Sequence, residues 1–548
     1  MSDASWWKQA VFYQIYPRSF YDADNDGVGD LRGIIEKLDY LNDGRGGGLG
    51  IDAIWISPFF PSPMADFGYD VSDYTAIHPI FGSLDDFDVL VSEAHARGIR
   101  VMIDLVFNHS SDQHPWFRES RRSRGNPKAD WYVWADPGDD GEPPNNWLSV
   151  FGGSAWAYEP ARDQYYLHSF LKEMPDLNWY SAKVREALAG VVRFWMDRGV
   201  DGFRFDAVDH YAYDRRLRPE PPRDYELAAL GDSEKTNPWC GHARIYCSDR
   251  PENIENLEFL RSVLDEKDGV VSLGEVGIVR DLESYIRKAA SYCRQPDRLH
   301  MAYTFAMLTR TPSPKWFAEI VRLMEEGGNS WPCWSLGNHD STRLASRYPG
   351  CGELYRTLQL VLLCMRGTPV LYYGDELDME QAELAFEEIR DPFGKAFWPD
   401  YKGRDGCRTP FPWDGTARNM GFNSGTEPWL PMRGASSLDR SQADPMSTLH
   451  LLRAMIRLRR EHPALSVGAY EELRQDDSVW AFARILKDER LFVAANFSAE
   501  ACSFPLPEEY RWLEQIRLEA FGDKNGAAQG GAVQLPGYGF YIGLNEKP

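Results

Sequence analysis

Short, continuous apolar segments alternate with segments of helical periodicity along most of the chain. Continuous apolar runs are typical of parallel strands that are covered on both faces. Such runs occur at Val11–Tyr16, Ala53–Ile56, Arg100–Leu105, Gly202–Phe205, Val270–Gly274, Leu299–Phe305, Pro332–Leu336 and Pro369–Tyr373. Helical periodicity occurs at Leu84–Arg97, Val184–Arg198, Ile254–Leu264, Trp316–Glu326 and Leu354–Met365. The pattern predicts an α/β fold of the (β/α)8 TIM-barrel type, with a doubly wound sheet as the alternative.

Two connections are too long for ordinary loops between a strand and a helix. Residues 106–178, after the third strand, are rich in Trp, Pro, Gly and Asn and predict an inserted subdomain; 378–445, after the eighth strand, are similar. A helix near Pro445–Glu461 precedes alternating segments that predict a C-terminal antiparallel β-sandwich. The predicted domains are a catalytic barrel (1–105 and 179–462), the insertion (106–178) and the β-domain (463–548).

Composition narrows the classes of partner. The chain has 548 residues, 60 basic against 83 acidic side chains, and a net charge of −23. Such a field repels nucleic acid and anionic membrane surfaces. The segment Met1–Lys8 lacks the features of a signal peptide, and no long apolar stretch occurs, so we expect a cytoplasmic protein. We expect the protein to be a monomer or a homodimer. The cysteines are expected to be reduced, with a Cys240–Cys247 disulfide as the weaker alternative.

Polar residues follow four of the predicted strands. In chain order these are Asp104 with Asn108-His109, Arg204 with Asp206, Glu275, and Asn338-His339-Asp340. A single Asp after a strand is usually a helix cap or a turn residue. Because the active site of a TIM barrel lies at the C-terminal ends of its strands, four such groups favour a catalytic site instead.

The types of residue at these positions indicate acid–base chemistry. Arg204 and Asp206 are two apart on a strand and face the same side, so the guanidinium favours an ionised carboxylate. Glu275 follows an apolar strand, where burial raises a carboxyl pKa towards that of a general acid. Two such carboxyl groups about 5 Å apart form the arrangement of a retaining glycosidase. Asp340 would be a third carboxylate near the sugar ring.

The same blocks resemble a known family. Asp104–His109, Gly202–Asp206, Gly274–Val276 and Asn338–Asp340 are similar, in order and spacing, to the four signature regions of the α-amylase superfamily, glycoside hydrolase family 13. The chain also resembles the α-glucosidase and oligo-1,6-glucosidase branch of this family, at Tyr13–Phe20, Ala65–Asp70, Gly403–Pro410 and Trp413. The resemblance implies that Asp206 is the nucleophile, Glu275 the acid/base and Asp340 the transition-state stabiliser. It also implies a pocket for the non-reducing glucose, lined by Asp66, Tyr69, His109, Arg204, His339 and either Arg404 or Arg408, with Arg404 favoured.

The resemblance further bears on linkage. The block Met174–Asn178 combines features of two branches, so it does not separate them. The residue after the nucleophile is Ala207, whereas valine there resembles α-1,6-specific enzymes. We therefore expect a retaining, exo-acting α-glucosidase that prefers short α-1,4-glucosides and also transfers glucose. The alternatives are an oligo-1,6-glucosidase, a sucrose isomerase or another glucosyltransferase of the superfamily, and, outside enzymes, a catalytically dead relative.

An acidic loop predicts a metal site. Asp22, Asp24, Asp26 and Asp30 take positions 1, 3, 5 and 9 of a calcium-type loop, Val28 offers its carbonyl at position 7, and Gly27 suits the sharp turn. The twelfth-position Glu of an EF-hand is absent, and the stretch resembles the structural Ca²⁺ or Mg²⁺ loop of the glucosidase branch. We expect a structural ion there, with a bare turn as the alternative, and no organic cofactor.

Overall fold

The computed structural model describes residues 3–224, 237–277, 281–308, 312–510 and 513–545. At its centre is an eight-stranded parallel sheet in the order β10-β11-β1-β2-β3-β7-β8-β9. A parallel bridge between Ala302 and Pro332 joins the two edges, so the sheet closes on itself. The barrel predicted from the apolar pattern is therefore confirmed. The strands are β1 (Phe12–Ile15), β2 (Ala53–Ile56), β3 (Arg100–Leu105), β7 (Gly202–Phe205), β8 (Val271–Val276), β9 (Met301–Thr304), β10 (Cys333–Ser335) and β11 (Thr368–Tyr372).

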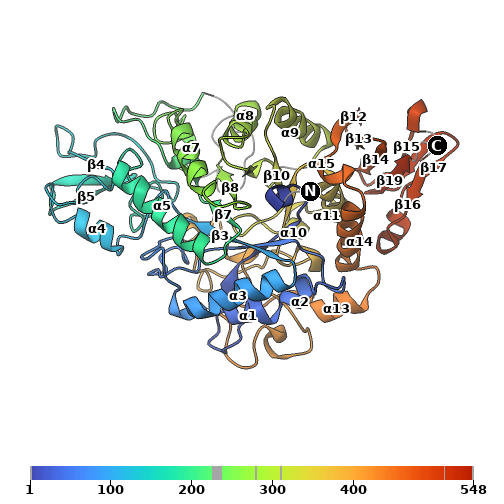
Figure 1. Cartoon of the computed structure of the whole chain (residues 1–548), viewed down its shortest axis with the longest axis horizontal. Helices are drawn as coiled ribbons and strands as arrows, with labels where there is room; N and C mark the ends of the chain where they lie inside the picture. Colours follow the sequence, from blue (N-terminus) through green and yellow to red (C-terminus); the bar gives the residue numbers. More distant parts are fainter. Residues whose placement is uncertain (1–2, 225–236, 278–280, 309–311, 511–512, 546–548) are drawn as a thin grey trace.

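Helices cover the outside of the barrel, because each buries one apolar face against the strands. Figure 1 shows α3, α5 and α7 following one another around it. In α5 the buried positions recur every three or four residues, at Val184, Leu188, Val191, Val192 and Trp195. The helices around the strands are α1 (Leu31–Glu36), α2 (Leu38–Leu41), α3 (Leu84–Ala96), α5 (Ala182–Asp197), α7 (Asn253–Leu264), α8 (Leu282–Tyr292), α9 (Pro314–Glu326), α10 (Leu344–Arg347), α11 (Leu354–Cys364) and α14 (Thr448–Glu461).

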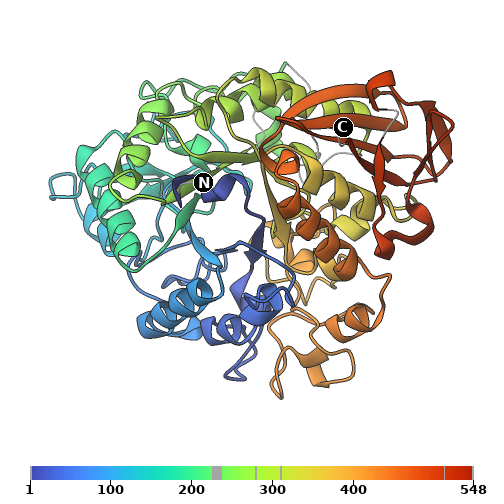
Figure 2. The same cartoon turned by 45° about the vertical axis from the view of Figure 1, so that its right-hand side comes forward.

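The insertion after β3 and the C-terminal domain lie on opposite sides of the barrel (Figures 1 and 2). The insertion contains α4 (Pro115–Ser120) and a small antiparallel sheet of β4 (Trp134–Ala135), β6 (Gln164–Leu167) and β5 (Trp156–Glu159). The long connection after β11 carries α12 (Pro392–Phe397) and α13 (Leu438–Ala443). Both long connections leave the C-terminal ends of strands, so both border the predicted site.

The C-terminal domain is formed by two antiparallel sheets, as predicted. Residues of both sheets, including Phe492 and Val533, share one apolar core. Its elements are a short α15 (Ala464–Val467), then a sheet of β12 (Ala469–Gln475), β13 (Val479–Leu486), β14 (Glu489–Asn496), β19 (Phe540–Asn545) and β16 (Glu514–Ile516), and a second of β15 (Cys502–Pro505), β18 (Ala532–Leu535) and β17 (Ala527–Gln529).

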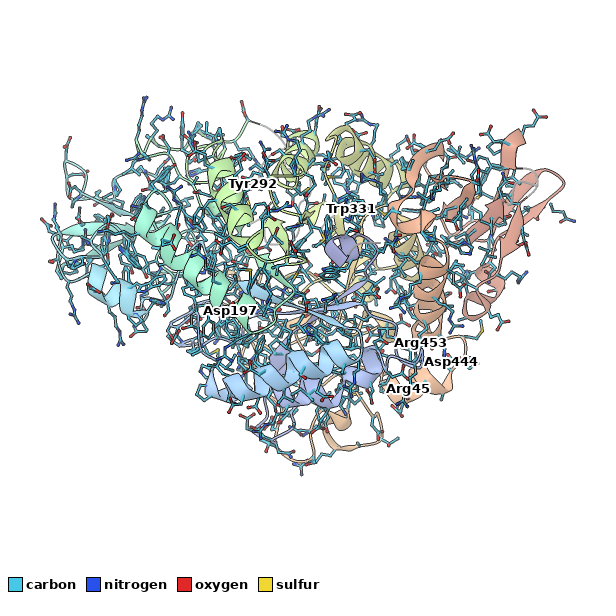
Figure 3. The ribbon with its side chains drawn as sticks, viewed as in Figure 1. Arg45, Asp197, Tyr292, Trp331, Asp444 and Arg453 are labelled. Carbon is cyan, nitrogen blue, oxygen red and sulfur yellow. The ribbon has the colours of Figure 1, made fainter. Side chains whose placement is uncertain are left out.

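Aromatic side chains close the N-terminal end of the barrel. The Trp7 ring lies 5.7 Å from that of Trp331, which is labelled in Figure 3. Both belong to the core that fills the barrel, together with Trp55, Met102 and Leu273. The opposite end is therefore the one left for polar chemistry. Within the described ranges, no helix has the length and apolar character needed to cross a bilayer.

Candidate active site

One buried guanidinium organises the centre of the site. Arg204, on β7, is fully buried, and its Nη1 lies 2.8 Å from Asp104 Oδ1 and 2.5 Å from Asp206 Oδ1. Its Nη2 lies 2.7 Å from Glu275 Oε2 and 3.0 Å from the Tyr303 hydroxyl. The ends of β3, β7, β8 and β9 thus meet at one side chain, because parallel strands place their C-terminal ends at one face.

Two opposing effects set the charges of these carboxyl groups: burial raises their pKa values, and the positive charge of Arg204 lowers them. Burial raises the pKa of Glu275 to about 8, and the charge of Arg204 only partly opposes this. Burial also raises the pKa of Asp206, to about 6, again against the opposing charge of Arg204. The negative charge of Asp206 raises the pKa of Glu275 further. At neutral pH the pair therefore holds one proton, on Glu275, beside an ionised Asp206.

The turn after the nucleophile candidate also contacts Glu275. Ala207 adopts the left-handed conformation (φ 44°, ψ 45°), which costs an L-residue roughly 1–2 kcal/mol. In this conformation its backbone N–H donates to Glu275 Oε2 at 3.0 Å, while the Tyr303 hydroxyl donates to Oε1 at 3.2 Å. Both oxygens of Glu275 are thereby oriented from β7 and β9. The apolar pattern predicts that Glu275 follows its strand, but in the structure Glu275 lies within β8, which extends to Val276.

A hydrogen-bond chain runs from β1 to Asp104. The Gln14 amide donates to His339 Nδ1 at 2.7 Å, which places the ring proton on Nε2. His339 Nε2 then donates to the Tyr69 hydroxyl (2.6 Å), and that hydroxyl donates to Asp104 Oδ2 (3.2 Å). Burial lowers the pKa of His339 to about 3, so the ring is neutral at pH 7 and acts as a donor of fixed direction.

Asp340 lies on the other side of this chain, between arginines. Its Oδ1 is 2.9 Å from Arg408 Nη2 and 3.2 Å from Arg404 Nη1. Burial alone would raise the pKa of Asp340, but His339 and the two guanidinium groups hold it well below its usual range. Asp340 is therefore ionised throughout the physiological range. Both arginines of the late loop reach this carboxylate, so the contact by itself does not separate Arg404 from Arg408.

Arg404 is buried and links three acidic side chains of the site. Its Nη2 lies 2.6 Å from Asp66 Oδ1 and 2.7 Å from Asp391 Oδ1. The loop that carries Asp66 is held by Asp70, whose carboxylate accepts hydrogen bonds from the backbone N–H groups of residues 65 and 66. His109 borders the same space: its Nε2 contacts the Tyr69 carbonyl at 3.2 Å, and its ring packs against Phe170. The structure thus brings together all ten of the catalytic and substrate-binding residues named from the sequence.

Three contributing residues were missed at the level of sequence. Tyr303 and Gln14 lie inside apolar strand segments, where they are indistinguishable from core residues. Asp391 precedes Pro392 and has the pattern of a helix cap, which it also is, since its Oδ1 accepts the Phe393 N–H. Its other contacts orient Arg404 through Nε, Nη2 and the backbone N–H. Nothing in the local sequence distinguishes an Asp that only caps a helix from one that also orients an arginine.

The acidic loop of residues 22–30 lies apart from these groups. Carboxylate oxygens of Asp22, Asp24 and Asp30 lie within 4.8 Å of one another, a donor set of hard oxygens that suits Ca²⁺ or Mg²⁺. Asp26 is outside this group; its Oδ1 accepts the Val28 N–H at 2.8 Å. Gly27 has φ +98°, and a Cβ there would lie 2.5 Å from the Glu427 carbonyl, so only glycine fits the turn.

Comparison with known proteins agrees with this fold. Residues 14–468 match the catalytic domain of α-amylase, and 470–542 match the C-terminal domain of maltogenic amylase. The chain is 47% identical to a probable α-glucosidase of Rhizobium meliloti (98% of this chain, 97% of the relative). It is 37% identical to an oligo-1,6-glucosidase of Parageobacillus thermoglucosidasius (92% of each). The crystal structure of the α-glucosyl transfer enzyme XgtA superposes with a TM-score of 0.93 at 45% identity, covering 98% of this chain and 99% of that one.

The fold, the carboxylate site and these matches define a glycoside hydrolase. The chain belongs to glycoside hydrolase family 13, the α-amylase family, and its relatives include a probable α-glucosidase and an oligo-1,6-glucosidase.

Proposed function

We propose that the enzyme is a retaining, exo-acting α-glucosidase that releases α-glucose from the non-reducing end of short α-1,4-glucosides. The observation that carries the proposal is that Asp206 and Glu275 both contact the Arg204 guanidinium, where burial raises the pKa of Glu275 further, to about 8, than that of Asp206, to about 6. An ionised carboxylate next to a protonated one supplies the nucleophile and the general acid of a double displacement.

In the first step, Asp206 attacks the anomeric carbon while Glu275 donates its proton to the oxygen of the departing sugar. The bond from the anomeric carbon to that oxygen breaks, and an ester to Asp206 forms. In the second step, Glu275 accepts a proton from water, which attacks the same carbon and releases Asp206. Asp340, ionised and oriented by Arg404 and Arg408, would stabilise the positive charge that develops on the ring.

The exo mode is supported by the Arg404 ion pairs. Arg404 is only 8% exposed, and it links Asp66, Asp340 and Asp391 across one end of the pocket. We infer that a buried network of this kind would block the binding of a longer chain beyond the non-reducing glucose. Asp66 and Arg404 would bind the hydroxyl groups of that glucose, with Tyr69 and His109 beside it.

Two specific alternatives follow from the comparisons. Similarity to a relative named oligo-1,6-glucosidase makes hydrolysis of α-1,6-glucosides the second candidate function for this enzyme. The likeness to an α-glucosyl transfer enzyme supports transfer of glucose to a sugar or alcohol acceptor in the second step. Ala207 is the residue on which we base the α-1,4 preference, because its small side chain leaves space beside the leaving group.

The test combines one variant with a sugar panel. Asp206→Asn should lower kcat on maltose by at least about 10⁴-fold, because the nucleophile carries the reaction. Asp400→Asn, an exposed carboxylate of the late loop, is the control. Product analysis on maltose, isomaltose, sucrose and trehalose should show fastest release from maltose, with α-glucose as the first product by NMR. Release of β-glucose, or near-normal turnover by the variant, would contradict the proposal.

We further propose that the loop 22–30 holds a structural Ca²⁺ or Mg²⁺. Asp22, Asp24 and Asp30 would supply carboxylate oxygens. Asp26, whose Oδ1 now accepts the Val28 N–H outside that group, and the Val28 carbonyl would complete the set on binding of the ion. Since the reacting carboxyl groups lie elsewhere, the ion would stabilise the loop and the segment docked on it, where Asn423 donates to Asp22 Oδ2 and the Trp429 N–H to the Gly27 carbonyl.

A further inference from the structure

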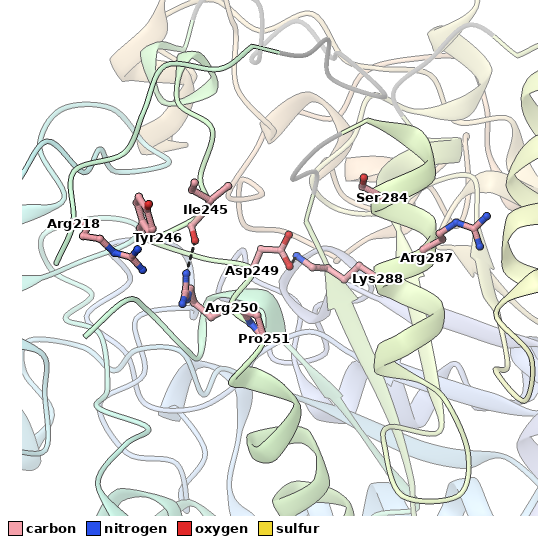
Figure 4. A pocket seen from close by; sticks show the side chains of 9 residues that line it. All are labelled: Arg218, Ile245, Tyr246, Asp249, Arg250, Pro251, Ser284, Arg287 and Lys288. Carbon is pink, nitrogen blue, oxygen red and sulfur yellow. Dashed lines mark hydrogen bonds and ion pairs between the residues drawn. The ribbon is translucent and has the colours of Figure 1, made fainter. Parts of the chain in front are cut away.

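Behind the nucleophile turn lies a cluster of one buried and two partly buried charged side chains that the reaction described above does not use. Asp209 follows Asp206 by three residues and is 1% exposed. Lys288, on α8, forms an ion pair with Asp249, and Figure 4 shows the two side chains pointing toward each other. The three side chains come from three separate segments: the turn after β7, the loop before α7, and helix α8.

The same cluster contacts both loops that carry the reacting groups. The Asp249 N–H donates to the Asp209 carbonyl at 2.8 Å, and Asn253 donates to the Val208 carbonyl at 2.6 Å. On the opposite side, Asp209 Oδ2 approaches Gly277 so closely that a Cβ there would lie 3.1 Å away. Gly277 is two residues beyond Glu275. Asp209 therefore lies between the turn after Asp206 and the segment after Glu275.

This turn needs external support. Ala207 holds a left-handed backbone conformation that is unfavourable for alanine, and its N–H must stay directed at Glu275. Such strain persists only where surrounding contacts over-determine the conformation. Among the described residues, the Asp249 N–H and the Asn253 side-chain amide both bond to carbonyl groups of this turn and so restrain its backbone.

Lys288 is the cation of the cluster. It faces Asp209 from the turn, Asp249 and Arg244 from the loop before α7, and the Tyr292 ring (5.8 Å) from its own helix. Asp209 also contacts His210, at 3.3 Å. Removing Lys288 would leave the buried Asp209 and the partly buried Asp249 with less positive charge to oppose them, which is costly chiefly for Asp209.

We propose that Lys288 is a positioning residue for the proposed nucleophile: its ammonium group, held between Asp209 and Asp249, fixes the turn Asp206–His210 against helix α8. This inference rests on the proposed function of Asp206. Lys288 contacts neither substrate nor a reacting atom, so it acts only through the turn.

The geometry implies a dependence on pH. Burial lowers the pKa of Lys288 to about 7, and the charge of Asp209 opposes this shift. The ammonium is therefore present below that pH and lost as the pH rises through it. In the wild-type enzyme this loss overlaps with the deprotonation of Glu275, so the two must be separated.

The experiment uses the full chain with Glu275→Gln and α-glucosyl fluoride, whose leaving group needs no proton. The burst of fluoride then reports attack by Asp206 alone. We expect the burst rate to rise through about pH 6 and to fall through about pH 7. Adding Lys288→Met should slow the burst about 10-fold at pH 6.5, whereas adding Lys288→Arg should restore the rate and remove the fall above pH 7.

The matched control is Arg287→Met on the same helix, an exposed residue paired with Glu283 and Glu326. It should leave both the burst and its pH profile unchanged. Thermal melts would confirm folding, and should Lys288→Arg not fold, the profile with native Lys288 decides. A Lys288→Met burst at the parental rate, or no fall near pH 7, would overturn the inference. Absence of any burst and of a glucosyl group on Asp206 by mass spectrometry would instead overturn the proposed function.

Discussion

Ala207 combines a left-handed backbone with a hydrogen bond to the proposed acid. We expect Ala207→Val to shift the ratio of kcat/KM values from maltose towards isomaltose, because valine narrows the space beside the leaving group. A β-branched residue is strongly disfavoured at positive φ, so the melting temperature should also fall. Ala207→Gly is the control: it removes the strain, adds no bulk, and should keep the maltose preference. An unchanged ratio in the valine variant would argue against the role of this position.

The two carboxyl groups also predict the pH dependence of the native enzyme. The kcat/KM for maltose should rise as Asp206 ionises, through about pH 6, and fall as Glu275 loses its proton, through about pH 8. The pKa of each group is raised by burial, so both limbs lie above the range of ordinary carboxylates. Initial rates at substrate concentrations well below KM, from pH 4 to 10, measure both limbs. A flat profile between pH 5 and 9 would contradict the assignment.

Replacing Asp391 should lower catalytic efficiency as much as replacing a residue that contacts the sugar directly. Asp391→Asn keeps one oxygen, which can still accept the Phe393 N–H, but it replaces the oxygen that accepts the Arg404 N–H and removes the charge that fixes the Arg404 side chain. We expect kcat/KM to fall about 100-fold, since small misplacements in a catalytic pocket have effects of that size. The melting temperature should change little. Steady-state kinetics test this, and activity equal to that of Asp400→Asn would show that Arg404 is positioned by other contacts.

At the scale of elements, apolar runs predicted the barrel strands because buried parallel strands have no polar face to obscure the pattern. The apolar pattern did not give the end of every strand. The predicted strand ends at Gly274, whereas β8 also includes Glu275 and Val276, because their backbones pair with Tyr303 and Thr304 of β9. Helix α8 was not predicted, because its buried face is built largely from tyrosine and alanine rather than from a strong aliphatic stripe. Both misses arise where tertiary packing outweighs the local signal.

The loop 22–30 gives a prediction about an element. If it binds Ca²⁺ or Mg²⁺, dialysis against a chelator should lower the melting temperature by roughly 5 °C, consistent with the about 2.7 kcal/mol that a ligand contributes at a hundredfold excess over its Kd. Asp24→Asn should remove the response, while Asp39→Asn, an exposed carboxylate elsewhere, should not. Differential scanning calorimetry with and without added ion provides the measurement. Equal melting temperatures in chelator and in Ca²⁺ or Mg²⁺ would exclude a bound ion of consequence.

At the scale of the whole molecule, the site depends on contacts that no local pattern encodes. The Asp66–Arg404 ion pair joins residues 338 apart in the chain, and Gln14 reaches His339 across 325. The residue types could be named from the family blocks, but their partners follow only from closure of the barrel. This is why Arg404 and Arg408 could not be separated by sequence, and why Asp391 was missed.

The barrel and the C-terminal domain share one apolar core. Trp480 on β13 is fully buried, and its ring lies 6.2 Å from that of Phe317 on α9. We expect Trp480→Ala to lower the free energy of unfolding by about 3–5 kcal/mol, the usual range for emptying a buried tryptophan site. Urea unfolding followed by circular dichroism measures this. Val89→Ala, half exposed on α3, is the control, and kcat at 25 °C should be unchanged in both variants.

The electrostatic coupling between Asp206 and Glu275 beside Arg204 has a consequence for the timing of the proposed reaction. The negative charge of Asp206 is one of the influences that raise the pKa of Glu275. When Asp206 becomes an ester it is neutral, so that influence disappears and Glu275 becomes a stronger acid at the moment its proton is needed by the departing oxygen. Having lost the proton, Glu275 is then ready to accept one from water. When the ester is cleaved, the returning charge on Asp206 retains that proton on Glu275, and the site is reset for the next cycle without any movement of the backbone.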